Sequence, residues 1–132
     1  MDVYGEADKI RHKLKNCSFQ ELDEREQIIL SIIELETEVN NGGFDQFYFN
    51  TSGDYAYFVP DALQRIGAFK AADIAARAND IFGSNIPKDR PTRQDIHQEL
   101  TNEDDEPWEE LDSEFYSYPD NISQLLETFL SS

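Results

Sequence analysis

Apolar residues recur every three or four positions along most of the chain, which is the spacing of one face of an α-helix. The longest such run lies between residues 18 and 39. Ser18 and Glu21 open it with the spacing of a capping box, so we expect a long helix from about Ser18 to Val39. Ile29 and Ile33 mark the apolar side of this helix. The residues expected on its opposite, polar side are Asp23, Gln27, Ser31, Glu34 and Glu38.

Asn and Gly residues end this run at positions 40–43, because both can take the left-handed conformation of a helix C-cap. A short helical turn then follows, with Phe44, Phe47 and Tyr48 on one inward-facing side. We expect residues 50–54 to form the loop after it.

The rest of the chain also reads as helical. The pattern predicts a short helix at 3–14, helices near 60–67 and 69–82, a weak helix at 94–100, and helices that begin near Pro107 and after Pro119. Residues 86–93, with two prolines, read as a long connection. No convincing alternating strand pattern occurs. The sequence therefore predicts an all-α fold, a single compact domain of about six to seven helices over residues 1–132.

The composition supports a folded domain in a reducing compartment. At 132 residues, with 39% hydrophobic and 12% aromatic residues, the chain can bury a core of its own. Cys17 is the only cysteine, so no internal disulfide can form and a cytoplasmic location is expected. The first residues lack the basic and apolar regions of a signal peptide, and no apolar run has membrane-spanning length, so neither export nor membrane insertion is expected.

Charge is distributed unevenly along the chain. Residues 1–93 hold 16 acids and all 11 bases, a balance of −5, and residues 94–132 hold 12 acids and no Lys or Arg, which completes the net charge of −17. Such a field repels nucleic acid and anionic membranes, and it speeds association with basic proteins. Direct nucleic-acid or membrane binding is therefore not expected, and a basic protein partner is.

Catalytic and metal-binding motifs are weak in this sequence. His12 and His97 lack the spacing of helical metal sites, and we expect both at the surface. The acidic run 103–106 lacks the alternating ligands and the glycine of an EF-hand loop, so no metal site and no cofactor are expected. An enzymatic alternative remains: a hydrolase that uses clustered carboxylates around Asn40, Asn41, Asp45, Gln46 and Asn50.

Some acids have the spacing of a charged strip. Glu34 and Glu38 lie one helical turn apart, a rise of about 6 Å. Duplex DNA presents one phosphate per roughly 3.4 Å of axis on each strand. A helix that carries such carboxylates can therefore resemble part of a phosphate row in sign and density, provided that other helices supply the rest.

A run of residues resembles a known family. Glu38 to Asn50, with Asn41-Gly42-Gly43-Phe44 at its centre, then Ser52-Gly53-Asp54 and the segment 62–68, is similar to the signature of a bacterial DNA-mimic protein family. The resemblance covers about residues 18–85 and leaves the acidic segment 94–132 outside. It implies a mainly helical protein that binds a helix-turn-helix transcription factor in place of DNA. A homodimer is also compatible with it, since a two-fold pair would match dimeric DNA-binding proteins.

The sequence thus favours a non-enzymatic DNA mimic that occupies the basic surface of a DNA-binding protein and blocks its access to DNA, with a helix-turn-helix regulator as one candidate partner. The alternative from the binding class is an acidic immunity or inhibitor protein against a basic toxin or nuclease. The candidate partner-binding residues are Glu34, Glu38, Glu103, Asp104, Asp105, Glu106, Glu109, Glu110, Asp112 and Glu114.

Overall fold

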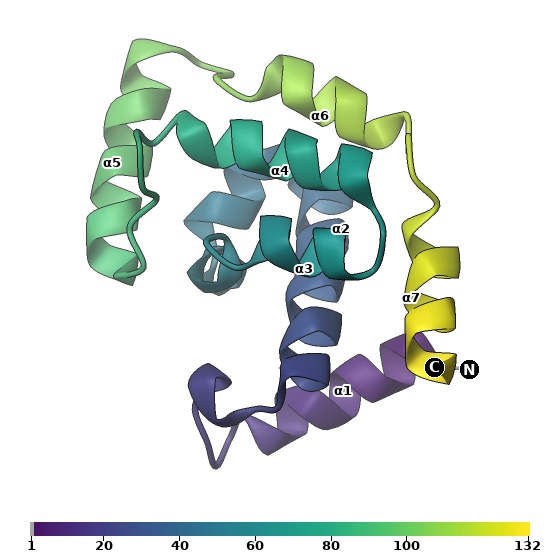
Figure 1. Ribbon diagram of the computed structural model, residues 1–132. Coiled ribbons are helices and arrows are strands. Elements are labelled where there is room, and N and C mark those ends of the chain that lie inside the picture. The colour runs from purple at the N-terminus through teal and green to yellow at the C-terminus, as the bar shows by residue number, and fades with distance from the viewer. Residues whose placement is uncertain (1) are drawn as a thin grey trace.

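Seven α-helices and two short 3-10 helices make up the computed structural model, which describes residues 2–132 and contains no strand within them. The prediction of a single all-α domain is confirmed. The longest helix, α2, runs through the middle of the molecule, and the other helices lie around it (Figure 1). The elements are α1 (Val3–Lys13), η1 (Phe19–Glu21), α2 (Glu24–Phe49), η2 (Thr51–Tyr55), α3 (Val59–Arg65), α4 (Phe69–Asp80), α5 (Arg90–Glu103), α6 (Glu109–Tyr116) and α7 (Ile122–Ser131).

The helix α2 is the centre of the core. Helices α1, α3, α5 and α6 all contact it, so every residue from Ile28 to Ile33 is buried. The expectation that Ser31 faces solvent on a polar side is wrong for this reason. Its hydroxyl is satisfied internally, because it donates to the carbonyl of Ile28 at 3.2 Å.

The long helix begins later than the sequence suggested. The amide and hydroxyl of Ser18 both donate to the Glu21 carboxylate at 3.0 Å, but this capping box belongs to η1. A second box starts α2: Asp23 accepts from the amide of Glu26 at 2.8 Å, and Glu26 accepts from the amide of Asp23 at 3.1 Å. Two boxes in succession turn the chain before α2 starts.

The two glycines at 42 and 43 kink α2 and do not end it. Gly42 and Gly43 have non-helical backbone angles, and the helix resumes directly with the aromatic turn. The prediction for Phe44, Phe47 and Tyr48 is confirmed, since each is at most 1% exposed. The segment expected to be a loop at 50–54 instead falls mostly within η2.

The helix α5 is longer than predicted and takes four residues from the expected connection at 86–93. Asp89 is its N-cap and accepts from the amide of Thr92 at 3.1 Å, and Pro91 occupies the first turn, where a missing N–H costs nothing. Arg93 therefore lies inside the helix. Its side chain is fully buried, which a connection would not have required.

Candidate functional site

One side of α5 carries a row of carboxylates. Asp95, Glu99 and Glu103 are exposed and follow one another at intervals of four residues, a rise of about 6 Å each. The opposite side of the helix turns inward with the buried Arg93 and His97. Asp95 and Glu99 were not among the candidates predicted from the sequence, although their four-residue spacing up to Glu103 predicts that the three acids share one side of a helix.

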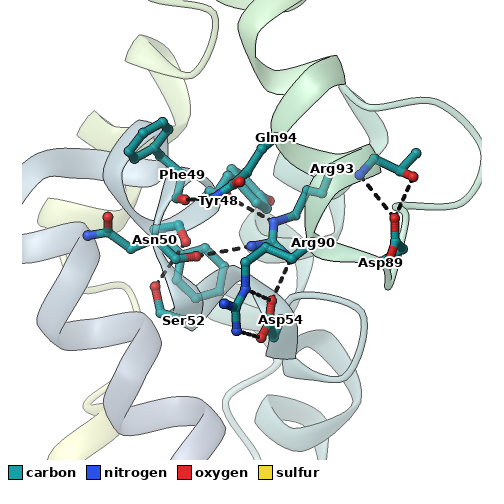
Figure 2. A network of polar contacts seen from close by, with 11 residues as sticks. Tyr48, Phe49, Asn50, Ser52, Asp54, Asp89, Arg90, Arg93 and Gln94 are labelled. Carbon is teal, nitrogen blue, oxygen red and sulfur yellow. Dashed lines mark hydrogen bonds and ion pairs between the residues drawn. The ribbon is translucent and has the colours of Figure 1, made fainter.

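Arg93 fastens α5 to the C-terminal end of α2, as Figure 2 shows. Its guanidinium donates to the carbonyls of Tyr48 at 2.9 Å and of Asn50 at 3.1 Å. The neighbouring Gln94 donates to the carbonyl of Phe49 at 2.8 Å. Carbonyls at a helix C-terminus lack donors within their own helix, so these side chains supply donors to the carbonyls of Tyr48 and Phe49, while the carbonyl of Asn50 also accepts from the amide of Gly53 at 3.0 Å. The acidic row is thereby held on a fixed support.

His97 gives α5 a second attachment. Its exposed fraction is 7%, its Nε2 lies 2.5 Å from a carboxylate oxygen of Asp45, and its ring stacks on the indole of Trp108 with centroids 5.7 Å apart. The expectation of a surface histidine is therefore wrong for His97, because α2 and Trp108 enclose the ring. His12 on α1 is exposed, as expected.

The row on α5 continues over the connection to α6. In Figure 1 these segments form the left edge, the upper left corner and the top of the molecule. All carboxylates in this stretch are exposed, and none forms an ion pair with any residue that the structure describes. We call the following residues the acidic surface: Asp95, Glu99, Glu103, Asp104, Asp105, Glu106, Glu109 and Glu110.

The bases that form ion pairs join acids outside the acidic surface. Apart from Arg77 with Glu114, every described ion pair of a lysine or arginine joins it to an acid within residues 1–93. No base among residues 2–132 therefore forms an ion pair with the acidic surface, and Arg77, which pairs with Asp73 and Glu114, lines one pocket beside it.

Two candidate residues of α6 have structural contacts. Asp112 is part-buried and accepts from the amide of Phe44 at 2.8 Å. Burial raises the pKa of Asp112, the Phe44 amide opposes this rise, and nearby acids add to it. Glu114 forms a two-pronged pair with Arg77 at 2.5 and 2.9 Å, and these hydrogen bonds lower the pKa of Glu114. Both residues hold α6 in place.

The carboxylates of the two candidates on α2 bond to residues outside the acidic surface. Glu34 is 19% exposed at its side chain and pairs with Arg11 of α1 at 2.6 Å. Glu38 accepts from the side-chain amides of Gln46 at 2.5 Å and Asn50 at 3.4 Å. Both carboxylates are engaged inside the molecule, so the structure does not bring them together with the exposed acids as one free row.

The family relationship is decided by a match to the family model described as DMP19-like protein, which spans residues 20–132. The chain belongs to the DMP19-like family. This is consistent with the DNA-mimic family that the sequence resembles. The matched region includes all of α5, α6 and α7, and so the whole acidic surface. The chain has no match among curated proteins or among solved structures.

The glycines of the resemblance have a geometric role in this DMP19-like protein. Gly43 has a φ of +73°, and a Cβ atom there would lie 2.7 Å from a carboxylate oxygen of Asp112. Because position 43 has no side chain, α6 can approach closely enough for Asp112 to accept a hydrogen bond from the amide of Phe44. This amide has no partner within the helix, since the helix resumes there after the kink.

The polar residues of the hydrolase alternative do not gather at one point. Gln46 and Asn50 both donate to Glu38, whereas Asn40 donates to the Tyr118 hydroxyl and Asp45 contacts His97. Residues 2–132 hold no group of three or more His, Cys, Asp or Glu side chains arranged for a metal ion. In the same part of the chain, no helix combines the length and apolarity needed to cross a membrane.

Proposed function

We propose that this DMP19-like protein is a DNA mimic whose acidic surface binds the basic DNA-binding surface of another protein and blocks its access to DNA. One observation carries the proposal: eight exposed carboxylates, from Asp95 to Glu110, follow one another along α5, the connection and the first turn of α6, and none of them forms an ion pair with a described residue. The family match supports it independently.

The spacing of the carboxylates supports an imitation of phosphate. The row on α5 places one charge per about 6 Å, roughly half the axial density of one DNA strand at about 3.4 Å per phosphate. The connection and the first turn of α6 add Asp104, Asp105, Glu106, Glu109 and Glu110 beside it. These groups supply charge where one helix face alone would supply too little.

The support beneath the acids favours binding to a preformed surface. Arg93, His97 and Trp108 are at most 7% exposed and attach α5 and the start of α6 to α2 and α4. A rigid charged face loses little conformational entropy when a partner binds. Glu34, Glu38, Asp112 and Glu114 act in this proposal by holding the helices, with the partner contacts at the exposed acids.

Affinity capture from a bacterial extract, at low and high salt and with duplex DNA as competitor, tests the proposal. The bait proteins are the wild type and a variant with Glu103→Gln, Asp105→Asn, Glu109→Gln and Glu110→Gln. A control variant with Glu6→Gln, Asp61→Asn, Asp80→Asn and Glu127→Gln has the same net charge as the first variant but keeps all the acids of the acidic surface.

We expect the wild type and the control to capture a DNA-binding protein that DNA and salt both displace, because basic sites regain counterions at high salt. The captured protein, once purified, should lose DNA binding when this protein is added. Capture of a toxin or nuclease through its catalytic domain would favour the immunity alternative, and equal capture by both variants would reject the role of the acidic surface.

A further inference from the structure

A cavity of about 530 Å³ lies on the side of the fold where α5 begins, away from the carboxylates that the proposed function uses. Its walls come from η1, η2 and the residues just before and at the start of α5. This volume is within the usual range of small-molecule sites, which is about 300–1,000 Å³. The residues that define its character are Phe19, Tyr55, Tyr57, Lys88, Asp89 and Arg90.

Aromatic rings form one part of the wall. Phe19 and Tyr55 pack with their ring centroids 4.7 Å apart, and Phe19 also meets Phe58 edge to face at 5.6 Å. These contacts fix the rings in place. A fixed aromatic wall favours a ligand with a flat, apolar part, because stacking on it costs little side-chain entropy.

Lys88 contributes a positive charge that no carboxylate neutralises in the described part of the chain. Its ammonium lies 4.5 Å from the centre of the Tyr57 ring, a cation–π contact. Lys15 and Lys70 likewise form no ion pair with a described residue, so Lys88 differs from them by its place in the wall of the cavity beside Tyr57. The same lysine and tyrosine also line a second cavity of about 470 Å³.

The two acids of the cavity are already engaged. Asp54 accepts from Arg90 at 2.5 and 3.1 Å and from Arg93 at 2.9 Å, as Figure 2 shows. Asp89 accepts from the amide and the hydroxyl of Thr92 at 3.1 and 2.6 Å. Two bases and two acids line the cavity, and both acids and Arg90 already have partners, so within the described structure the positive charge of Lys88 is the one left free for a ligand.

We propose that this cavity binds a small organic anion whose negative group is carried on or near a flat ring, as in an aryl carboxylate or a nucleoside monophosphate. The ring lies against Tyr55 and Tyr57, and the anionic group meets Lys88. Binding here does not depend on DNA mimicry, because none of the cavity residues belongs to the acidic surface.

Titrations of the full-length protein with AMP, salicylate and inorganic phosphate test the proposal by calorimetry and by amide chemical shifts. We expect saturable binding of AMP or salicylate, with chemical-shift changes at Tyr57 and Lys88. Inorganic phosphate should bind about tenfold more weakly because it lacks a ring. Response to AMP alone would assign the site to nucleotides, and response to salicylate alone would assign it to aryl carboxylates.

Lys88→Gln should weaken binding about tenfold, since it removes a charge-assisted contact. Lys70→Gln, an exposed lysine on α4 outside the cavity, is the matched control and should leave affinity unchanged. Both lysines are exposed, so both variants should keep the wild-type helical content. Absence of saturable binding by both aromatic anions, equal loss in the two variants, or phosphate binding as tight as AMP would overturn the proposal.

Discussion

The carboxylate of Asp112 on α6 accepts a hydrogen bond from the backbone amide of Phe44 on α2, at 2.8 Å. The two residues are 68 positions apart in the sequence. Asp112 acts as an N-cap for the part of α2 that resumes after the kink, although it belongs to another helix. The contact couples the glycine pair in the middle of the chain to the helix that carries the end of the acidic surface.

Gly43→Ala should destabilise the protein by about 1–3 kcal/mol, because a side chain is disfavoured at a φ of +73° and its Cβ would lie 2.7 Å from Asp112. Urea unfolding followed by circular dichroism measures the loss. Gly83→Ala is a matched control, since Gly83 has a φ of +119° but no atom within 4 Å of a Cβ. Gly43→Ala should lose more stability than Gly83→Ala, and this difference should shrink when Asp112 is also replaced by Ala. An unchanged difference would contradict a role of the contact with Asp112.

Arg93→Met should destabilise the protein by about 3–5 kcal/mol, because it leaves the carbonyl of Tyr48 without its buried donor and removes one of the two donors to the carbonyl of Asn50. Arg90→Met removes an exposed guanidinium from the same carboxylate of Asp54 and should cost about 1 kcal/mol or less. Denaturant midpoints of the two variants compare them directly. Similar losses would mean that the pair with Asp54, and not the burial of Arg93, sets the stability.

Most helices could be predicted from the sequence because their apolar spacing is local information. The start of α5 could not, because Arg93 reads as a polar residue of a proline-rich connection. Its partners are the carbonyls of Tyr48 and Asn50 and the carboxylate of Asp54, which lie 39–45 positions earlier in the sequence. The burial of His97 likewise depends on distant residues. The burial of Ser31 could not be predicted either. A periodic pattern predicts a helix with one side in solvent, whereas α2 is covered on all sides between Ile28 and Ile33.

The candidate acids could be predicted in part. Their exposure in the connection and at the start of α6 follows from the lack of any base nearby in the sequence. The internal contacts of Glu34 with Arg11 and of Asp112 with Phe44 depend on tertiary packing, which no local pattern reveals. Their part in partner binding, like that of all the candidate acids, stays a prediction.

Glu36→Gln should stabilise the protein relative to the wild type, and this gain should be larger at pH 7 than at pH 4. Glu36 is 5% exposed, and one of its carboxylate oxygens has no partner among residues 2–132, while the other accepts from the Tyr118 hydroxyl at 2.9 Å. Burial raises the pKa of Glu36, and the Tyr118 hydroxyl opposes part of this rise.

Proton linkage sets the sign of this pH dependence. Below the ordinary pKa of glutamate, Glu36 is protonated in the folded and the unfolded states and costs nothing. As pH rises through the raised folded pKa, the wild type must bury a charge, whereas glutamine does not titrate. Urea unfolding at the two pH values measures the difference. Glu127→Gln, at an exposed position, should show no such dependence, and the same response in both variants would argue against a buried charge.

Neutralising the row on α5 separates its role in folding from its role in binding. The triple variant Asp95→Asn, Glu99→Gln, Glu103→Gln removes like charges at intervals of four residues, and Glu103 also lies at the helix C-terminus, where an acid is unfavourable. We expect higher thermal stability at low salt and a smaller gain at high salt, where screening already weakens the repulsion. The control Glu6→Gln, Asp61→Asn, Asp73→Asn removes three acids that each face a base and should show no gain. Increased stability combined with weaker capture of a DNA-binding protein would show that the row costs stability and serves a partner; decreased stability would assign it to the fold instead.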